Sequence, residues 1–453
     1  MKAINPATGV TLREYPDHDS REIERRLGAA SSAFDDWSRR SFAERASVFR
    51  RIAALLRERR RVLAELMALE MGKPVTQGQG EADKCALACE YFAEHAAAFL
   101  ADEPVRTEAS KSFVAYRPLG VVLAIMPWNF PLWQVFRFCA PALMAGNVAL
   151  VKHAPNVPGC ALALSSLFHD AEAPSGLLDV LFVDEKQTGA IIDDARIAAV
   201  TLTGSTRAGR AVASRAGQAL KRCVLELGGS DAYVVLADAN VEQAAAIASR
   251  ARLVNAGQSC IAGKRFIVVE AIRDAFERAF VAKMSAAVVG DPRDPATEIG
   301  PLARLDLRDA LVRQVDESVA RGAKLVLGGA ISDKPGAWFP PTVLSDVRPN
   351  MPAFDEELFG PVAALVSARD EADAVRLANA SRYGLGGAVL TSDPVRGERL
   401  ARDALDAGAC FVNAEVRSDP RLPFGGIKES GYGRELGAFG IKEFTNVKSV
   451  WVA

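Results

Sequence analysis

The sequence has few residues of the kinds that hold metal ions or form disulfides. Its 453 residues include seven cysteines and four histidines, and neither type is clustered. A zinc site needs several such ligands close together, so we expect no bound metal. An odd number of scattered cysteines is typical of reduced thiols in the cytoplasm rather than of a disulfide framework.

The sequence also lacks an excess of charge and a long apolar run. The formal net charge is −1, which argues against binding of nucleic acid or another polyanion. The longest apolar zone, residues 121–151, is interrupted by prolines, asparagines and an arginine. A helix that crosses a membrane needs about 20 apolar residues in a row. The opening residues MKAINPATG have no apolar core, so we expect no signal peptide and no membrane contact.

What the chain does contain is an alternation of helical and strand-like patterns. Residues 1–100 are expected to be helical, with a capping-box pattern at residues 41–44 and a helix stop at Gly72 and Pro74. The expected strands that follow are residues 120–125, 147–152, 179–183 and 198–204 in a first series, and 232–236, 265–269, 323–329, 362–366, 387–391 and 409–413 in a second. Helix-length spacers between them predict parallel sheets, and therefore an α/β protein whose two units meet near residues 226–230.

One cysteine lies in an unusual environment. The stretch VNAGQSCIAGKR, residues 254–265, places Cys260 in a turn of small residues between two glycines. Such neighbours would leave its sulfur accessible, and a helix beginning just after it would favour the thiolate. Cys260 is therefore a candidate nucleophile, with an incidental cysteine as the alternative. No histidine follows at a spacing that would suggest a Cys–His pair.

Three further segments could carry chemistry. Asn129 in MPWNFP follows an expected strand, where its amide could donate to a developing oxyanion. Glu226 in LELGG interrupts an apolar stretch, and burial would raise its pKa toward that of a general base. Gly204 and Ser205 lie between an expected strand and a helix, where free N–H groups could accept a phosphate. A turn asparagine, a buried ion-pair residue and an ordinary helix cap are the respective structural alternatives.

Taken together, these segments resemble the aldehyde dehydrogenase superfamily. The matching motifs, in chain order, are PWNFP at residues 127–131, GST at 204–206, ELGG at 226–229, GQSC at 257–260, ELFGP at 357–361 and PFGGIK at 423–428. The resemblance covers most of the chain. It implies a Rossmann-like cofactor domain, an α/β catalytic domain, and a small β arm that makes homodimers or homotetramers. The expected bounds are 1–103 and 118–227 for the cofactor domain, 228–420 for the catalytic domain, and 104–117 and 421–453 for the arm and tail.

The resemblance assigns a catalytic role to three of these residues. Cys260 would attack the aldehyde carbon, and the Asn129 amide with the Cys260 backbone N–H would hold the oxyanion. After hydride transfer to NAD or NADP, Glu226 would activate water to release the carboxylic acid. An acylating dehydrogenase, a silent nucleotide-binding protein and a thiol hydrolase without a cofactor are the rival classes. Glu226 argues against the first, because a base that activates water favours hydrolysis, and the three residues together argue against the second.

The cofactor is implied by the same resemblance. The family's nucleotide-binding pattern falls on Trp128, Lys152, Gly204, Ser205, Glu357 and Phe359. NAD-preferring relatives often have a glutamate three residues after the lysine, but this chain has Pro155 there. With no carboxylate to repel a 2′-phosphate, NADP should be tolerated, and the preferred nucleotide stays open.

The substrate is expected to carry a carboxylate. Gln134 and Arg137 are three residues apart in a plausible helix after Asn129, so they share a face that by resemblance lines the substrate tunnel. An arginine there suits a carboxylate, although a surface or ion-paired arginine is the alternative. Ser418 falls where succinate-semialdehyde dehydrogenases have a carboxylate-binding serine. We therefore expect succinate semialdehyde as substrate, with glutarate semialdehyde or a general aliphatic aldehyde as the alternative.

Overall fold

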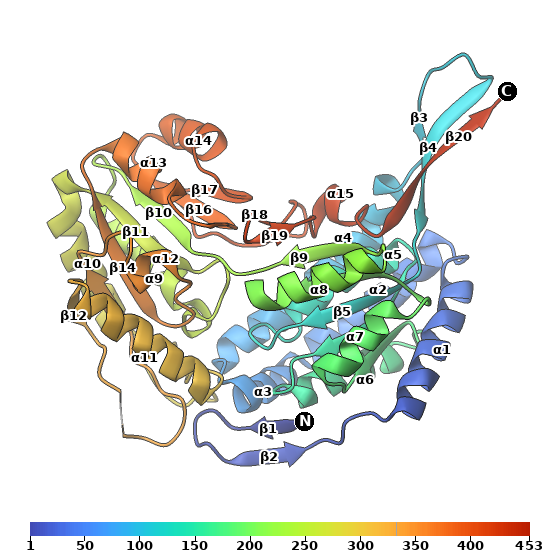
Figure 1. Ribbon diagram of the computed structural model, residues 1–453, viewed down its shortest axis with the longest axis horizontal. Helices are drawn as coiled ribbons and strands as arrows, with labels where there is room; N and C mark the ends of the chain where they lie inside the picture. The colour runs from blue at the N-terminus through green and yellow to red at the C-terminus, as the bar shows by residue number, and fades with distance from the viewer. Residues whose placement is uncertain (332) are drawn as a thin grey trace.

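Two large, mainly parallel sheets organise the chain, as the computed structural model shows for residues 1–331 and 333–453 (Figure 1). The sheets lie side by side and are joined by the short segment between Glu226, which ends β9 (Arg222–Glu226), and Asp231, which begins β10 (Asp231–Val235). The predicted α/β class is confirmed. The part of the chain described contains no helix with the length and hydrophobicity of a membrane span.

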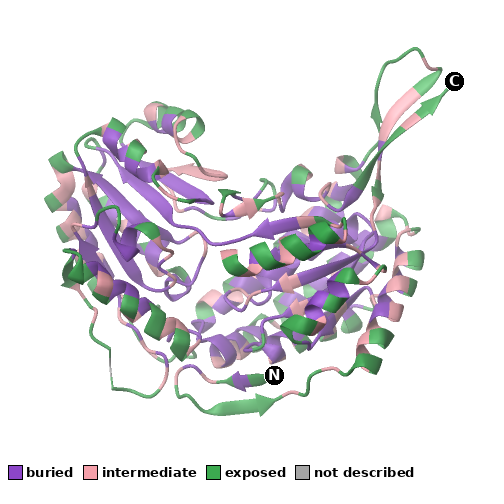
Figure 2. Cartoon of the chain, viewed as in Figure 1, coloured by how far each residue is buried: buried purple, intermediate pink, exposed green. Residues whose placement is uncertain are grey.

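The first sheet has the strand order β19-β9-β8-β5-β6-β7. Its other strands are β5 (Val121–Met126), β6 (Val148–His153), β7 (Leu178–Leu181), β8 (Ile197–Thr203) and the antiparallel edge strand β19 (Gly431–Tyr432). The parallel strands are runs of valine, leucine and isoleucine that are buried on both faces (Figure 2), as expected for a sheet covered by helices on each side. Because β6 and β8 both pair with β5 in parallel, the loops that follow these strands lie at one edge of the sheet.

Eight helices precede or cover this sheet. They are α1 (Ser20–Trp37), α2 (Phe42–Glu58), α3 (Arg60–Met71), α4 (Val75–Phe99), α5 (Trp133–Met144), α6 (Pro158–Asp170), α7 (Glu185–Asp193) and α8 (Thr206–Gln218). The capping box predicted at residues 41–44 starts α2, and Gly72 ends α3 with φ +77°. A side chain at Gly72 would also meet the carbonyl oxygen of Pro301 at 2.6 Å, so this helix end requires glycine.

The second sheet has the order β12-β13-β14-β11-β10-β16-β17, with β12 antiparallel to the rest. Its strands besides β10 are β11 (Gly263–Val269), β12 (Lys324–Leu327), β13 (Thr342–Ser345), β14 (Val362–Ala368), β16 (Gly386–Leu390) and β17 (Ala409–Val412). The associated helices are α9 (Val241–Leu253), α10 (Arg273–Ser285), α11 (Leu305–Ala320), α12 (Pro352–Asp355), α13 (Glu371–Asn379) and α14 (Pro394–Asp403).

A three-stranded sheet projects from the body of the molecule (Figure 1). In it β4 (Lys111–Pro118) pairs with both β3 (Glu103–Pro104) and β20 (Thr445–Val452). Smaller elements complete the chain: the hairpin β1 (Lys2–Ile4) and β2 (Thr11–Glu14), the pair β15 (Tyr383–Gly384) and β18 (Ile427–Lys428), and the short helix α15 (Gly437–Gly440). The β1–β2 hairpin corrects the expectation that residues 1–100 are helical.

Candidate active site

A cavity of about 810 Å³ has Cys260 in its wall. It collects side chains from α4, α5 and α9, and from the loops that carry Cys260 and Ser418. The predicted substrate residues Gln134, Arg137 and Ser418 all line it. Lys84, which the sequence reasoning did not single out, lines it as well.

The loop before Cys260 has an unusual backbone. It includes the 3₁₀ turn η1 (Val254–Gly257), in which Asn255 and Ala256 both have φ +53° and Gly257 has φ +74°. A side chain at Gly257 would collide with the carbonyl oxygen of Gly360, so only glycine fits there. Three successive residues in the left-handed region are costly, and such strain is tolerated where the surrounding structure holds it.

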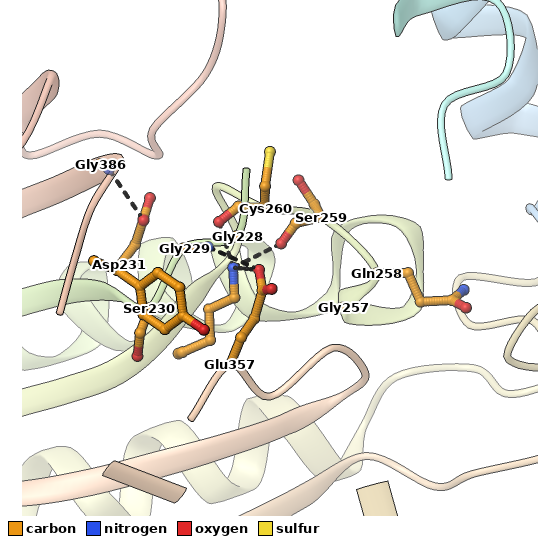
Figure 3. Close-up of polar contacts among 12 residues, drawn as sticks. Gly228, Gly229, Ser230, Asp231, Gly257, Gln258, Ser259, Cys260, Glu357 and Gly386 are labelled. Atoms are coloured by element: carbon orange, nitrogen blue, oxygen red, sulfur yellow. Dashed lines mark hydrogen bonds and ion pairs between the residues drawn. The ribbon is translucent and has the colours of Figure 1, made fainter. Parts of the chain in front are cut away.

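Hydrogen bonds of Lys264 fix the other side of this loop. Its buried Nζ donates to the carbonyl oxygens of Ser259, at 2.7 Å, and of Cys260. The Cys260 side chain points away from Glu357, on the opposite side of the loop (Figure 3). The cysteine backbone N–H makes no hydrogen bond within the described residues, so it stays available as a donor.

The environment of the Cys260 thiol differs from the sequence expectation in one respect. No helix begins after Cys260, because β11 starts at Gly263, so a helix dipole does not assist the thiolate. Burial raises the pKa of the Cys260 thiol to about 12, while the charges of Arg137 and Lys264 act in the opposite direction. The resting thiol is therefore neutral, and a proton acceptor must assist its attack.

Asn129 is held against the cysteine loop. Its Nδ2 donates to the carbonyl oxygen of Gln258 at 3.1 Å, and its own carbonyl oxygen accepts from Asn255 Nδ2 at 2.7 Å. An amide nitrogen carries two hydrogens, so one donor of Asn129 is left after the bond to Gln258. The Asn129 side chain thus contacts the loop at Gln258, two residues before Cys260.

Glu226, at the end of β9, is a buried carboxyl group without a hydrogen bond. The residue is 2% exposed, and neither Oε1 nor Oε2 has a partner in the described residues. Burial raises the pKa of Glu226 well above its usual range, opposed by the charge of Arg137. The charge of Glu226 also contributes to the raised pKa of Cys260. A carboxyl of this kind can exchange protons near neutral pH.

Glu357 lies on the other side of the cysteine loop. Its Oε1 accepts from the Gly229 N–H at 2.9 Å and lies 3.6 Å from Lys264 Nζ. A side chain at Gly228 would approach Glu357 Oε2 to 2.6 Å, so the glycine pair lets the backbone and carboxylate meet. Nearby, the rings of Trp128 and Phe359 contact edge to face, with centroids 5.7 Å apart.

The remaining predicted nucleotide residues lie at one edge of the first sheet. Ser205 caps α8, its Oγ accepting from the Ala208 N–H at 3.3 Å, and Gly204 precedes it. Lys152, at the end of β6, is half-buried, and burial lowers its pKa. A helix N-terminus with small residues and a nearby ammonium suits the phosphates and hydroxyls of a dinucleotide. Among the described residues no group of histidine, cysteine and acidic side chains could hold a metal ion.

Arg137 is not a free cation. Its Nε pairs with Glu435, both side chains being 2% exposed, and Nη2 donates to Thr203 Oγ1 at 3.1 Å. Its guanidinium also lies over the Phe424 ring, 4.6 Å from the centroid. Arg137 therefore already has a carboxylate partner, as in the ion-paired alternative that the sequence left open.

Gln134 and Ser418 each have hydrogen-bonding capacity that the described residues do not use. Gln134 is 2% exposed, and its Oε1 makes no hydrogen bond with the described residues. Ser418 Oγ accepts from Lys84 Nζ at 2.8 Å and from Trp133 Nε1 at 3.1 Å. Arg252, a buried arginine near the cysteine loop, does not line the cavity. It donates to the carbonyl oxygens of Gly257 and Val362.

Comparison with known proteins shows the family. The model of the aldehyde dehydrogenase family matches residues 1–450. A probable succinate-semialdehyde dehydrogenase (NADP(+)) from Synechocystis sp. is 48% identical over 453 residues, covering 100% of both chains. Succinate semialdehyde dehydrogenase (NAD(P)+) Sad from Escherichia coli is 47% identical over 449 residues, covering 99% of this chain and 97% of its own.

Solved structures agree as well. Succinic semialdehyde dehydrogenase from Streptococcus pyogenes, solved in complex with NADP+ as the cofactor, superimposes with a TM-score of 0.97 at 36% identity. The match covers 100% of this chain and 99% of the other. With a family model that spans almost the whole sequence, and with Cys260, Asn129 and Glu226 gathered at one seam, the chain belongs to the aldehyde dehydrogenase family.

Proposed function

We propose that this protein oxidises succinate semialdehyde to succinate with NADP or NAD. The relatives named above support both the substrate and the cofactor. The observation that carries the proposal is the cavity itself, which has a thiol, Cys260, in its wall together with cationic and hydroxyl side chains. A substrate with an aldehyde at one end and a carboxylate at the other matches that combination.

Cys260 is the proposed nucleophile. Because its thiol is neutral at rest, Glu226 accepts the thiol proton as sulfur bonds to the carbonyl carbon. The carbonyl oxygen gains the negative charge, and the second Nδ2 hydrogen of Asn129 and the Cys260 backbone N–H donate to it. Both donors are preformed, so stabilising this charge needs no rearrangement of the loop.

Oxidation and release complete the turnover. A bound nicotinamide would supply the acceptor for the hydride that leaves the former carbonyl carbon. Cys260 is then the sulfur of a thioester. Glu226 first releases the thiol proton to solvent, then takes a proton from water as the water attacks the thioester, and passes that proton to the departing sulfur. The products are the carboxylic acid, the free thiol and one released proton. A buried carboxylate without hydrogen bonds is suited to both proton transfers, because no partner competes for its oxygens.

The residues proposed to hold the nucleotide fit its parts. Ser205 and Gly204 would face the pyrophosphate, Lys152 the adenine ribose, and Glu357 the nicotinamide ribose, with Trp128 and Phe359 nearby. Two relatives named for NADP(+) or NAD(P)+ support acceptance of NADP. Pro155 is exposed beyond β6 and brings no negative charge to that edge.

The proposal includes domain roles, assembly and location. The unit of the first sheet would bind nucleotide, the unit of the second would carry the thiol, and the projecting β3–β4–β20 sheet would join copies of the chain into a homodimer or homotetramer. Exposed Val447, Trp451 and Val452 on β20 support this, since apolar side chains gathered on a projecting sheet suit an interface. We place the enzyme in the cytoplasm, as the scattered cysteines of the sequence suggest.

A panel of aldehydes tests the proposal. Succinate semialdehyde, glutarate semialdehyde and butanal would each be assayed with NAD and NADP, following the absorbance of the reduced nicotinamide. Succinate semialdehyde should have the highest kcat/KM, and the Cys260→Ala protein should be inactive. A higher kcat/KM for butanal would refute the substrate assignment, and a higher value for glutarate semialdehyde would favour the longer substrate.

A further inference from the structure

Lys84 presents an ammonium group to the same cavity as Cys260. It belongs to α4, and its Nζ lies 2.8 Å from Ser418 Oγ and 4.2 Å from the centroid of the Trp133 ring. All three side chains line the cavity. An ammonium has three hydrogens and the bond to Ser418 uses one, so Lys84 can donate to a further acceptor.

Lys84 differs from the other cations of the cavity wall. Four basic side chains line it: Lys84, Arg137, Arg250 and Lys283. The last three are paired with Glu435, Glu415 and Glu242, respectively. Within residues 1–331 and 333–453, Lys84 has no carboxylate within ion-pair distance. The two acidic residues just before it on α4 have other partners. Asp83 pairs with Arg60, and Glu81 pairs with Lys73 and accepts from the backbone N–H groups of Leu132 and Trp133, at 2.9 Å each.

Ser418 extends the same donor site. Its oxygen accepts two hydrogen bonds, from Lys84 and from the Trp133 indole, which occupy both of its lone pairs. The hydroxyl hydrogen has no acceptor in the described residues, so it is left to donate. An ammonium and a hydroxyl side by side, both with unused hydrogens, form a site for an anionic oxygen pair.

We infer that Lys84, with Ser418 beside it, binds the carboxylate end of the aldehyde substrate and is thereby the residue that selects semialdehydes. This rests on the proposed function, and it names the charge that recognises the substrate. Arg137 is the less suitable partner, because a substrate carboxylate would have to compete with Glu435, whose charge would otherwise be left buried and unpaired.

The electrostatics around Lys84 agree with this role. Burial lowers the pKa of Lys84 to about 8, and the charge of Arg137 lowers it further, against the opposing effects of Cys85, Glu81 and Asp419. Burial thus makes the charged form of Lys84 less favourable, and a substrate carboxylate beside it would offset this loss of hydration. The face of the Trp133 ring attracts the Lys84 ammonium, as a carboxylate would, but more weakly.

Removing the charge from Lys84 tests the inference. In Lys84→Met the stem keeps its length but loses the ammonium. The KM for succinate semialdehyde should rise about 10- to 150-fold, which is the effect of one hydrogen bond to a charged group, while the kcat/KM for butanal stays within about threefold. Lys84→Arg keeps the charge and should recover part of the affinity. Arg250→Met removes a cation that is exposed and already paired, and should change neither substrate's KM by more than about twofold.

The outcomes separate this inference from the function it rests on. Equal losses for both aldehydes in Lys84→Met, with the wild type still preferring the semialdehyde, would overturn the role of Lys84 and leave the substrate assignment standing. A wild type that prefers butanal would instead refute the proposed function. If Lys84→Met does not fold, as judged by circular dichroism, Lys84→Gln and the Ser418→Ala variant provide the same comparison of the two aldehydes.

Discussion

The guanidinium of Arg137 and the carboxylate of Glu435 form an ion pair in which each side chain is only 2% exposed. The two residues are 298 positions apart, so the pair ties α5 to the segment that follows β19. Breaking a buried pair leaves one charge without a partner, which typically costs about 3–5 kcal/mol. This gives Arg137 a structural role that can be separated from substrate binding.

We therefore predict that Arg137→Leu destabilises the protein by about 3–5 kcal/mol, because Glu435 is then buried and unpaired. Any loss of kcat/KM should be similar for succinate semialdehyde and butanal. Denaturant unfolding and steady-state kinetics measure the two effects. The double variant Arg137→Leu/Glu435→Leu is the control and should regain part of the stability. A selective loss for the semialdehyde alone would show that Arg137 contacts the substrate carboxylate.

The Cys260 thiol should react slowly with alkylating agents at neutral pH. Since burial raises its pKa to about 12, the thiol is protonated below that value, and its thiolate fraction rises about tenfold for each pH unit. Labelling by iodoacetamide, followed by mass spectrometry of the peptide that contains Cys260, should therefore accelerate steadily from pH 7 to pH 10 in the protein without nucleotide. A plateau below pH 8 would contradict this, because it would reveal a thiolate already stabilised at rest.

Replacement of Glu226 should separate oxidation from release of the acid. Glu226→Gln keeps the size of the side chain but cannot accept a proton from water, so we expect kcat to fall about 10²- to 10⁴-fold. The first turnover should slow as well, because Glu226 also accepts the thiol proton, but attack by water should slow more, so that a burst of one reduced nicotinamide per active site appears in stopped-flow absorbance. Hydroxylamine, which attacks thioesters directly, should restore turnover. Absence of both the burst and the rescue would place Glu226 in the attack step alone.

The nucleotide preference should respond to charge at residue 155. Pro155 is exposed in the loop after β6, at the same sheet edge as Ser205. In Pro155→Glu a carboxylate would repel the 2′-phosphate of NADP, so the ratio of kcat/KM for NADP over NAD should fall about tenfold or more. Pro155→Gln is the uncharged control and should change the ratio much less. An unchanged ratio in Pro155→Glu would place the 2′-phosphate elsewhere.

The local parts of the fold were predictable from the sequence. Valine-rich runs such as residues 148–153 form strands because both faces are buried, and the capping pattern at Ser41 starts a helix because its hydrogen bonds are made within one turn. The prediction of a helix after Cys260 was wrong, because the small residues there suit a helix start as well as a turn before a strand. The segment forms strand β11 because it pairs in parallel with β10 and β14, and these strands lie elsewhere in the chain.

The candidate site was predictable only where a motif carries it. Cys260, Asn129 and Glu226 stand in recognisable motifs, and the structure gathers them at the seam between the sheets. Lys84 has no such signal, because its partner Ser418 lies 334 residues away. The pairing of Arg137 with Glu435 is hidden for the same reason: charge compensation is a property of the folded neighbourhood rather than of the local sequence.

Lys84 should also give substrate binding a pH dependence that depends on the substrate. With its pKa lowered to about 8, chiefly by burial, the ammonium is fully charged at pH 6.5 and loses its proton as the pH rises through about 8. The kcat/KM for succinate semialdehyde should therefore fall about tenfold per unit above pH 8, relative to that for butanal, because only the semialdehyde needs the charge. Taking this ratio cancels the titration of Cys260 and Glu226, which act on both aldehydes. In Lys84→Arg, whose guanidinium stays charged throughout, the ratio should be flat from pH 6.5 to pH 9.5. The same fall in Lys84→Arg as in the wild type would assign the titration to another group.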